Sequence, residues 1–120
     1  MTLGQKQRRF VKLVGKLIEY AYANGYELTF AEAYRTPEQA SLNAKSGAGI
    51  SKSLHTVRLA IDLNLFKDGV YQTDSKAHKP LGTYWKSLAP DCRWGGDFLD
   101  KNGQPKPDGN HYSIEHEGRK

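Results

Sequence analysis

The sequence predicts a small α+β domain in which helices cover a sheet. A chain of 120 residues is long enough for one hydrophobic core and too short for two. Apolar residues recur at helical spacing over residues 5–24, whereas over 59–65 they alternate with small and polar residues, as in a strand with one buried face. We therefore expect a single domain over 1–120 that contains both kinds of element.

The composition narrows the class of protein. A hydrophobic fraction of 38%, with two Trp, seven Tyr and four Phe, is typical of a folded globule rather than a disordered chain. No apolar run approaches membrane-spanning length and no charged, apolar and small leader begins the sequence, so we expect neither membrane insertion nor an ordinary secretory signal. The single Cys92 excludes an internal disulfide and a cysteine-rich zinc cage, and we expect it to pack beside Trp94.

A formal net charge of +5 fits a polyanionic partner. Nucleic acid, a membrane surface and an anionic cell wall all meet that description, and charge does not choose among them. No recognisable nucleic-acid-binding motif accompanies the charge, which ranks that partner last.

Local signals place the remaining elements. Basic residues lie largely opposite the apolar stripe of the first helix, and Gly25 follows where a left-handed residue would end it. A loop of small residues over 46–53 leads to His55, and His78 is expected to be exposed in a polar linker. Strands are expected over 26–30, 59–65, 70–71 and 108–115. A helix is expected over 37–45, where Thr36, Pro37 and Gln39 suit a capping box, and another is expected to begin at Pro80 and end before Pro90.

Five polar residues form a complete hydrolytic set. His55, Asp62 and His111 supply two imidazoles and one carboxylate, a donor set that suits zinc and leaves the fourth tetrahedral position for water. Asp108 stands three residues before His111, from where its carboxylate can reach that water as general base. Arg35, at a strand-to-helix corner, can stabilise the oxyanion that forms at an attacked carbonyl.

The order of these motifs resembles that of a known family. Ser53-x-His55, then Asp62, then Asp108-x-x-His111 is similar to the D-alanyl-D-alanine carboxypeptidase or VanY-like zinc peptidases. The closer likeness is to the small phage endolysins of that family, the L-alanyl-D-glutamate endopeptidases. With these the chain shares the Tyr-Arg-Thr-x-Glu-Gln corner at 34–39 and the Trp-Gly-Gly-Asp-Phe segment at 94–98.

The resemblance implies both a fold and a function. It implies an antiparallel sheet that carries zinc, with helices packed on one side, and hydrolysis of an amide bond in the peptide stem of peptidoglycan. In the phage enzymes that bond joins L-alanine to D-glutamate. It further implies zinc at His55, Asp62 and His111, with Asp108 as base and Arg35 at the oxyanion. The substrate-side residues that it implies are Ser53, Gln39, Trp94 and Asp97.

Two positions depart from the family pattern. Arg58 stands where the family commonly has Gly, so a positive φ there would strain the backbone; alternatively, Arg58 contacts an acidic stem peptide. Ser113 stands where the family often has Glu, and His116 follows close behind. We favour His111 over His116 as the ligand, because only His111 has an acidic residue three positions before it.

Other functions remain open at this point. The same site would suit a D,D-carboxypeptidase that removes terminal D-alanine, or a zinc-containing module that binds the wall without cutting it; loss of the acidic base would mark the latter, and Asp108 is present. For the lysin we expect a monomer with no separate wall-binding module. We expect it to be made in the host cytoplasm without a signal peptide and to act at the cell wall after release.

Overall fold

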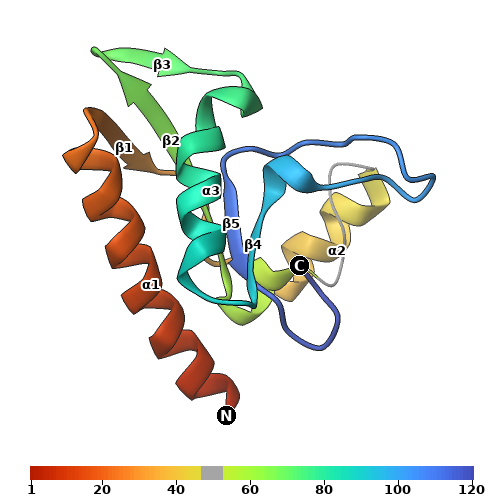
Figure 1. The fold of residues 1–120 in the computed structure, drawn as a ribbon. Coiled ribbons are helices and arrows are strands. Elements are labelled where there is room, and N and C mark those ends of the chain that lie inside the picture. The colour runs from red at the N-terminus through yellow and green to blue at the C-terminus, as the bar shows by residue number, and fades with distance from the viewer. Residues whose placement is uncertain (47–52) are drawn as a thin grey trace.

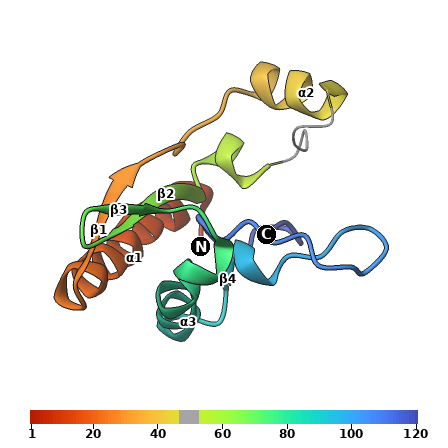
Figure 2. The ribbon, with the colours of Figure 1, turned by 90° about the horizontal axis from the view of Figure 1, so that it is seen from above.

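The computed structural model describes residues 1–46 and 53–120, so most of the small-residue loop expected over 46–53 lies outside the described residues. An antiparallel sheet of five strands has the order β1-β2-β5-β4, with β3 paired to β2 beside this path (Figure 1). Helices α1 and α3 lie on one side of the strands and α2 lies on the other (Figure 2). The predicted α+β class with an antiparallel sheet is confirmed, and only two of the three α-helices share a side.

Helix α1 (Leu3–Ala23) begins at a capping box. Thr2 accepts a hydrogen bond from the Gln5 backbone, and the Gln5 side chain accepts one from the Thr2 N–H. The apolar stripe predicted from the sequence is the buried face of the helix, which contacts β1 and α3. Its buried residues are Phe10, Leu13, Val14, Leu17 and Ala21.

The central strand β2 (Ala60–Lys67) pairs with three other strands. It pairs with β1 (Tyr26–Phe30) along one edge. A turn at Asp68 and Gly69 leads from β2 to the short β3 (Val70–Gln72), which also pairs with it. The alternation predicted from the sequence is present in its burial. Leu63 and Leu65 are fully buried in the core, whereas Asp62 and Asn64 on the other face are only partly covered.

The other edge of the sheet carries the last two strands. β5 (His111–Ile114) pairs with β2 and with β4 (Cys92–Trp94), and all four residues of β5 are buried. Helix α3 (Lys79–Leu88) packs on β4 and α1. Trp85 from α3 is fully buried, and its indole N–H donates to the carbonyl oxygens of Arg93 and Ser113 in the two strands.

His78 corrects one prediction from the sequence. It was expected in an exposed linker, yet it ends the 3-10 helix η2 (Ser75–His78) with only 3% of its surface exposed. Its Nδ1 lies 2.8 Å from the hydroxyl of Tyr112, which is itself fully buried. Burial lowers the pKa of His78 to about 4, because the charged imidazolium loses its hydration. The polar neighbours in the sequence gave no sign of this tertiary contact.

Helix α2 (Pro37–Ser46) stands apart from the helical layer and buries only Ala40. Its start follows the predicted signals, since the backbone N–H of Gln39 donates to Thr36 Oγ1. The side chain of Gln39 does not return to Thr36 and instead donates to Asn43. Therefore only half of the predicted capping box is present.

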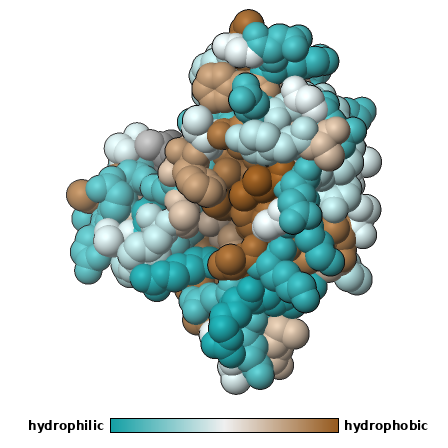
Figure 3. All heavy atoms as spheres, turned by 90° about the vertical axis from the view of Figure 1, so that its left-hand side faces the viewer, coloured by the Kyte–Doolittle hydropathy of each residue, from teal (hydrophilic) through white to brown (hydrophobic). Residues whose placement is uncertain are grey.

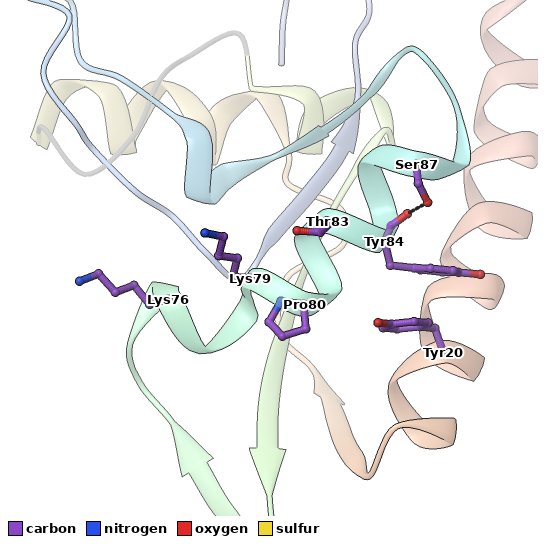
Figure 4. Close-up of a pocket in the computed structure, with 7 residues that line it drawn as sticks. All are labelled: Tyr20, Lys76, Lys79, Pro80, Thr83, Tyr84 and Ser87. Carbon is purple, nitrogen blue, oxygen red and sulfur yellow. Dashed lines mark hydrogen bonds between the residues drawn. The ribbon is translucent and has the colours of Figure 1, made fainter.

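The described surface includes an apolar hollow and a hollow lined by two tyrosines. One is apolar and lies between α1 and the segment that follows β1, where brown side chains gather in Figure 3; it includes Val14, Phe30, Tyr34, Arg58 and Ile61. The second lies where α1 meets α3, and there Tyr20 and Tyr84 stack with ring centroids 4.0 Å apart (Figure 4). Its full lining is Tyr20, Lys76, Lys79, Pro80, Thr83, Tyr84 and Ser87. Among the described helices, none is long and apolar enough to span a bilayer.

The buried His78 predicts a pH dependence of stability. The pKa of His78 is 6.5 in the unfolded chain and about 4 in the folded protein. Between these two pH values the imidazole is protonated in the unfolded state and neutral in the folded state. Stability is therefore full above pH 6.5 and falls towards pH 4, by about 1–3 kcal/mol from this group. His78→Gln should flatten that fall. Melting temperatures of both proteins between pH 4 and pH 7 measure it, and parallel curves would contradict the assignment.

Candidate metal centre

Strand pairing brings the predicted ligands together from distant parts of the chain. His55 lies in the 3-10 helix η1 (Leu54–Val57), Asp62 in β2 and His111 in β5. Asp62 and His111 are direct cross-strand partners. The neighbouring Leu63 N–H bonds the Asn110 carbonyl, which makes Asp62–His111 a non-hydrogen-bonded pair, the type whose side chains lie closer.

The distances fit a tetrahedral ion. Asp62 Oδ1 lies 3.3 Å from His55 Nε2 and 3.3 Å from His111 Nδ1. Zinc bonds of about 2.0–2.1 Å give a tetrahedral edge of about 3.3–3.4 Å, which these two distances match, and all three ligand atoms lie within 4.8 Å of one another. Both histidines are buried, and Asp62 Oδ1 is a buried oxygen with no hydrogen-bond partner among the described residues. An orphaned carboxylate oxygen between two imidazoles is what a cation site requires.

Electrostatics favour the charged forms in the metal-free cluster. Burial opposes ionisation of Asp62, yet the imidazoles of His111 and His55 beside the carboxylate outweigh it and lower the pKa of Asp62 to about 2. Burial likewise disfavours the charged form of His55, but the carboxylate of Asp62 raises its pKa overall. A bound metal ion would supply the positive charge beside the Asp62 carboxylate.

Residues 31–35 hold two of the ligands through their backbone. Asp62 donates its N–H to the carbonyl of Glu32 at 2.8 Å, and its own carbonyl accepts from Ala31. The carbonyl of Ala33 lies 3.2 Å from His55 Nδ1, the ring nitrogen opposite the ligand atom. The N–H of Arg35 donates to the His55 carbonyl. An acceptor at Nδ1 fixes the tautomer that leaves Nε2 free to bind a metal.

Ser53 acts on the same ligand from the other side. Its side chain caps η1 and accepts a hydrogen bond from the backbone N–H of His55. Ser53 therefore supports the ligand through its backbone, and the substrate contact expected of Ser53 stays a prediction.

The Trp94–Phe98 segment supports the second histidine. Asp108 donates its N–H to the Gly95 carbonyl at 2.8 Å, and a Cβ on Gly95 would overlap the Asp108 carbonyl and lie 2.8 Å from the Cβ of His111. Only glycine allows the turn before β5 to approach this closely. Trp94 is buried, and its indole N–H donates to the carbonyl of Gly109 in the same turn. The aromatic ring of Phe98 lies against His111, with centroids 5.2 Å apart.

Asp108 and Arg35 lie at the edge of the cluster. Asp108 Oδ2 is 4.0 Å from His111 Nδ1 and its side chain is half-exposed, so it faces the cluster without occupying a ligand position. Partial burial raises the pKa of Asp108, and the negative charge of Asp62 adds to the effect. Arg35 is mostly covered and pairs with Glu32. The structure thus brings all five predicted residues to one place.

The other predicted residues lie in different settings. Gln39 is exposed and bonds Asn43, and Asp97 forms an exposed ion pair with Lys86, so a substrate contact from either stays a prediction. Trp94 is buried in the fold, which fits a core residue and leaves its predicted substrate contact without support. His116 lies 2.9 Å from Lys6 Nζ and outside the three-residue cluster, which supports the choice of His111.

Arg58 has the positive φ that its position in the family pattern implied. Its φ of 57° and ψ of 36° are left-handed, where glycine is the residue without strain. Its guanidinium lies 4.0 Å above the ring of Tyr34, a cation–π contact that offsets part of the strain.

Glu32 is the site residue that the sequence analysis missed. Its Oε1 lies 4.0 Å from His55 Nε2, and the same oxygen accepts two N–H groups of Arg35. One signal was available, since an acidic residue three positions before Arg35 can pair with it. Nothing in the sequence indicated that this pair would face the metal ligands.

Comparisons with known proteins agree with this geometry. Over 89 residues, 69% of this chain, the sequence is 35% identical to an L-alanyl-D-glutamate peptidase of Listeria phage A118, and the chain spans only 30% of that relative's length. The fold is similar to the L-Ala D-Glu endopeptidase ChiX of Serratia marcescens, at a TM-score of 0.71 and 16% identity, covering 93% of this chain and 85% of that one. No family model matches the chain.

A further structural neighbour contains a metal. A mutant of the vancomycin resistance D,D-pentapeptidase VanY, solved in complex with Zn(II), matches at a TM-score of 0.59 and 22% identity, covering 88% of this chain and 70% of that one. The sequence match and the fold together place the chain among the VanY-like zinc peptidases. Within that class, the predicted likeness to the phage L-alanyl-D-glutamate peptidases is confirmed by the viral relative.

The ligand assignment predicts unequal effects of removing two nearby histidines. His111→Ala should reduce bound zinc from about one ion per chain to almost none at equimolar zinc, because three protein ligands are needed for a stable open site. His116→Ala should keep its zinc, since that ring lies beside Lys6. Metal analysis after desalting measures both. Zinc lost from the His116 variant and retained by the His111 variant would reverse the assignment.

Proposed function

We propose that the chain is a zinc-dependent peptidoglycan hydrolase that cleaves the amide bond between L-alanine and D-glutamate in the stem peptide. The observation that carries this proposal is the cluster of His55, Asp62 and His111 with an uncoordinated carboxylate at its edge. The named activity of the phage relative supports the choice of bond. The net charge of +5 fits the anionic polymers of a bacterial wall.

Each residue of the site has a distinct role in the proposed reaction. Bound zinc would supply Lewis acidity and a water whose pKa falls to about 7. Asp108 takes the proton of the attacking water and returns it to the leaving amine. Arg35 places a fixed positive charge where the carbonyl oxygen becomes an oxyanion. The metal ligands are held in place by their backbone: Asp62 and His111 are paired strand residues, and the carbonyl of His55 accepts a hydrogen bond from Arg35.

A D,D-carboxypeptidase is the second candidate. The structural likeness to VanY, a D,D-pentapeptidase, favours it, although at 22% identity that likeness speaks for the fold alone. A zinc-containing module that binds the wall without cutting it is the third, and the presence of Asp108 beside His111 weighs against it. We further propose a monomer that is made in the host cytoplasm, acts at the cell wall after release and binds no nucleic acid.

Digestion of purified peptidoglycan with mass analysis of the products tests the reaction, the metal and the base together. Wild-type protein should release fragments cut between L-alanine and D-glutamate. Chelator-treated protein should release essentially none and recover with added zinc. Asp108→Ala should lose about 10²–10⁴-fold in rate, as expected for loss of a general base.

Controls separate the candidates. Asp100→Ala is the matched control, because Asp100 is a carboxylate of the same loop that, among the described residues, accepts hydrogen bonds from the backbone of that loop. This variant should digest the wall as wild type does. Release of free D-alanine would identify the carboxypeptidase instead. Equal activity of wild type, chelated protein and Asp108→Ala would refute the mechanism.

A further inference from the structure

One carboxylate oxygen joins the metal cluster to the predicted oxyanion residue. Arg35 donates its Nε–H to Glu32 Oε1 at 3.0 Å, and its Nη2 donates to the same oxygen. That oxygen is 4.0 Å from His55 Nε2, the atom that faces Asp62. Glu32 therefore lies between the guanidinium and the ligands, with Arg35 only 14% exposed and Glu32 36% exposed.

The backbone directs Glu32 to this side of the sheet. In the β1–β2 register Phe30 faces Leu63, so regular alternation would place Ala31 opposite Asp62 and turn Glu32 to the other face. Instead Ala31 donates to the Asp62 carbonyl and Glu32 accepts from the Asp62 N–H, so two residues oppose one, as in a β-bulge. The extra residue aims the Glu32 side chain at the ligands.

Glu32 and Asp108 lie on opposite sides of the cluster and differ in their ion-pair partners. Glu32 lies on the His55 side and is paired with Arg35. Asp108 lies on the His111 side, and among the described residues it forms no ion pair with Lys or Arg. Among the described residues, the group whose ligand atoms all lie within 4.8 Å of one another is His55, Asp62 and His111, which leaves Glu32 outside the ligand set.

We propose that Glu32 is a positioning residue that holds the Arg35 guanidinium against the metal cluster, a role that rests on the proposed hydrolase function. By binding the Nε and Nη2 edge it fixes a side chain that otherwise has several rotatable bonds. Among the described residues Nη1 has no acceptor, so this end of the fork is free to meet the oxyanion. Glu32 acts through Arg35 and touches no reacting atom.

A double-mutant cycle on a soluble stem peptide tests the coupling. Glu32→Gln should lower kcat by about tenfold to a hundredfold with little change in KM, as a displaced oxyanion donor does. In the Arg35→Ala background the same change should have about no further effect, because the residue it positions is gone. Glu27→Gln is the matched control, because Glu27 is an exposed carboxylate in β1, the strand that leads to Glu32. This variant should behave as wild type.

Two readouts independent of turnover exclude the other roles of a carboxylate. Zinc content should be equal in wild type and Glu32→Gln, since Glu32 is no ligand. In metal-free protein the Arg35 Nε–H should give a slowly exchanging NMR signal that Glu32→Gln loses and Glu27→Gln keeps. Zinc loss from Glu32→Gln would make Glu32 a ligand and overturn the proposal.

The cycle also separates this proposal from the function on which it rests. An active wild type with unaltered kcat in Glu32→Gln, or with fully additive losses in the double variant, refutes the positioning role alone. An inactive wild type refutes the hydrolase itself, and the NMR signal then still reports whether Glu32 holds Arg35.

Discussion

The pairing of β2 with β5 is the constraint on which the site depends. Asp62 and His111 are 49 positions apart in the sequence, yet the antiparallel register makes them direct neighbours on one face. A slip of one residue would turn one of them into the core and destroy the cluster. Leu63, Leu65, Tyr112 and Ile114 are fully buried on the opposite face, so the same hydrophobic burial that stabilises the sheet also fixes the register of the ligands.

The segment after β1 gives the site its second layer. Over a few residues it bonds the backbone of Asp62, the ring of His55 and the carbonyl of His55, and it carries both Glu32 and Arg35. A metal ligand whose other ring nitrogen is bonded is held in one orientation and one tautomer. This arrangement explains why an arginine at a strand end can take part in a site whose ligands lie on other elements.

The sequence carried the local part of this structure well. Alternation at 59–65 predicted the strand that holds Asp62, and the spacing of acidic residue and His111 predicted which histidine joins it. The features that the sequence did not predict depend on tertiary contacts. His78 reads as a polar linker residue, and only the packing of Tyr112 against η2 makes it buried. The bulge that turns Glu32 towards the ligands depends on how Asp62 pairs, which no local pattern records.

The hollows elsewhere on the surface do not share this organisation. The stacked pair of Tyr20 and Tyr84 and the apolar hollow beside α1 lack the cluster of His55, Asp62 and His111. The chemistry of the described chain is therefore concentrated where three separate segments meet. Length and charge alone leave several partners open, whereas the cluster at that meeting point indicates a metal site.

A crystal structure of the zinc-loaded protein, with anomalous data collected on both sides of the zinc absorption edge, tests the central claim most directly. Our account predicts one peak within about 2.0–2.2 Å of His55 Nε2, an Asp62 carboxylate oxygen and His111 Nδ1. A peak at His116, or one that is bound through Glu32 or Asp108 in place of these atoms, would contradict it.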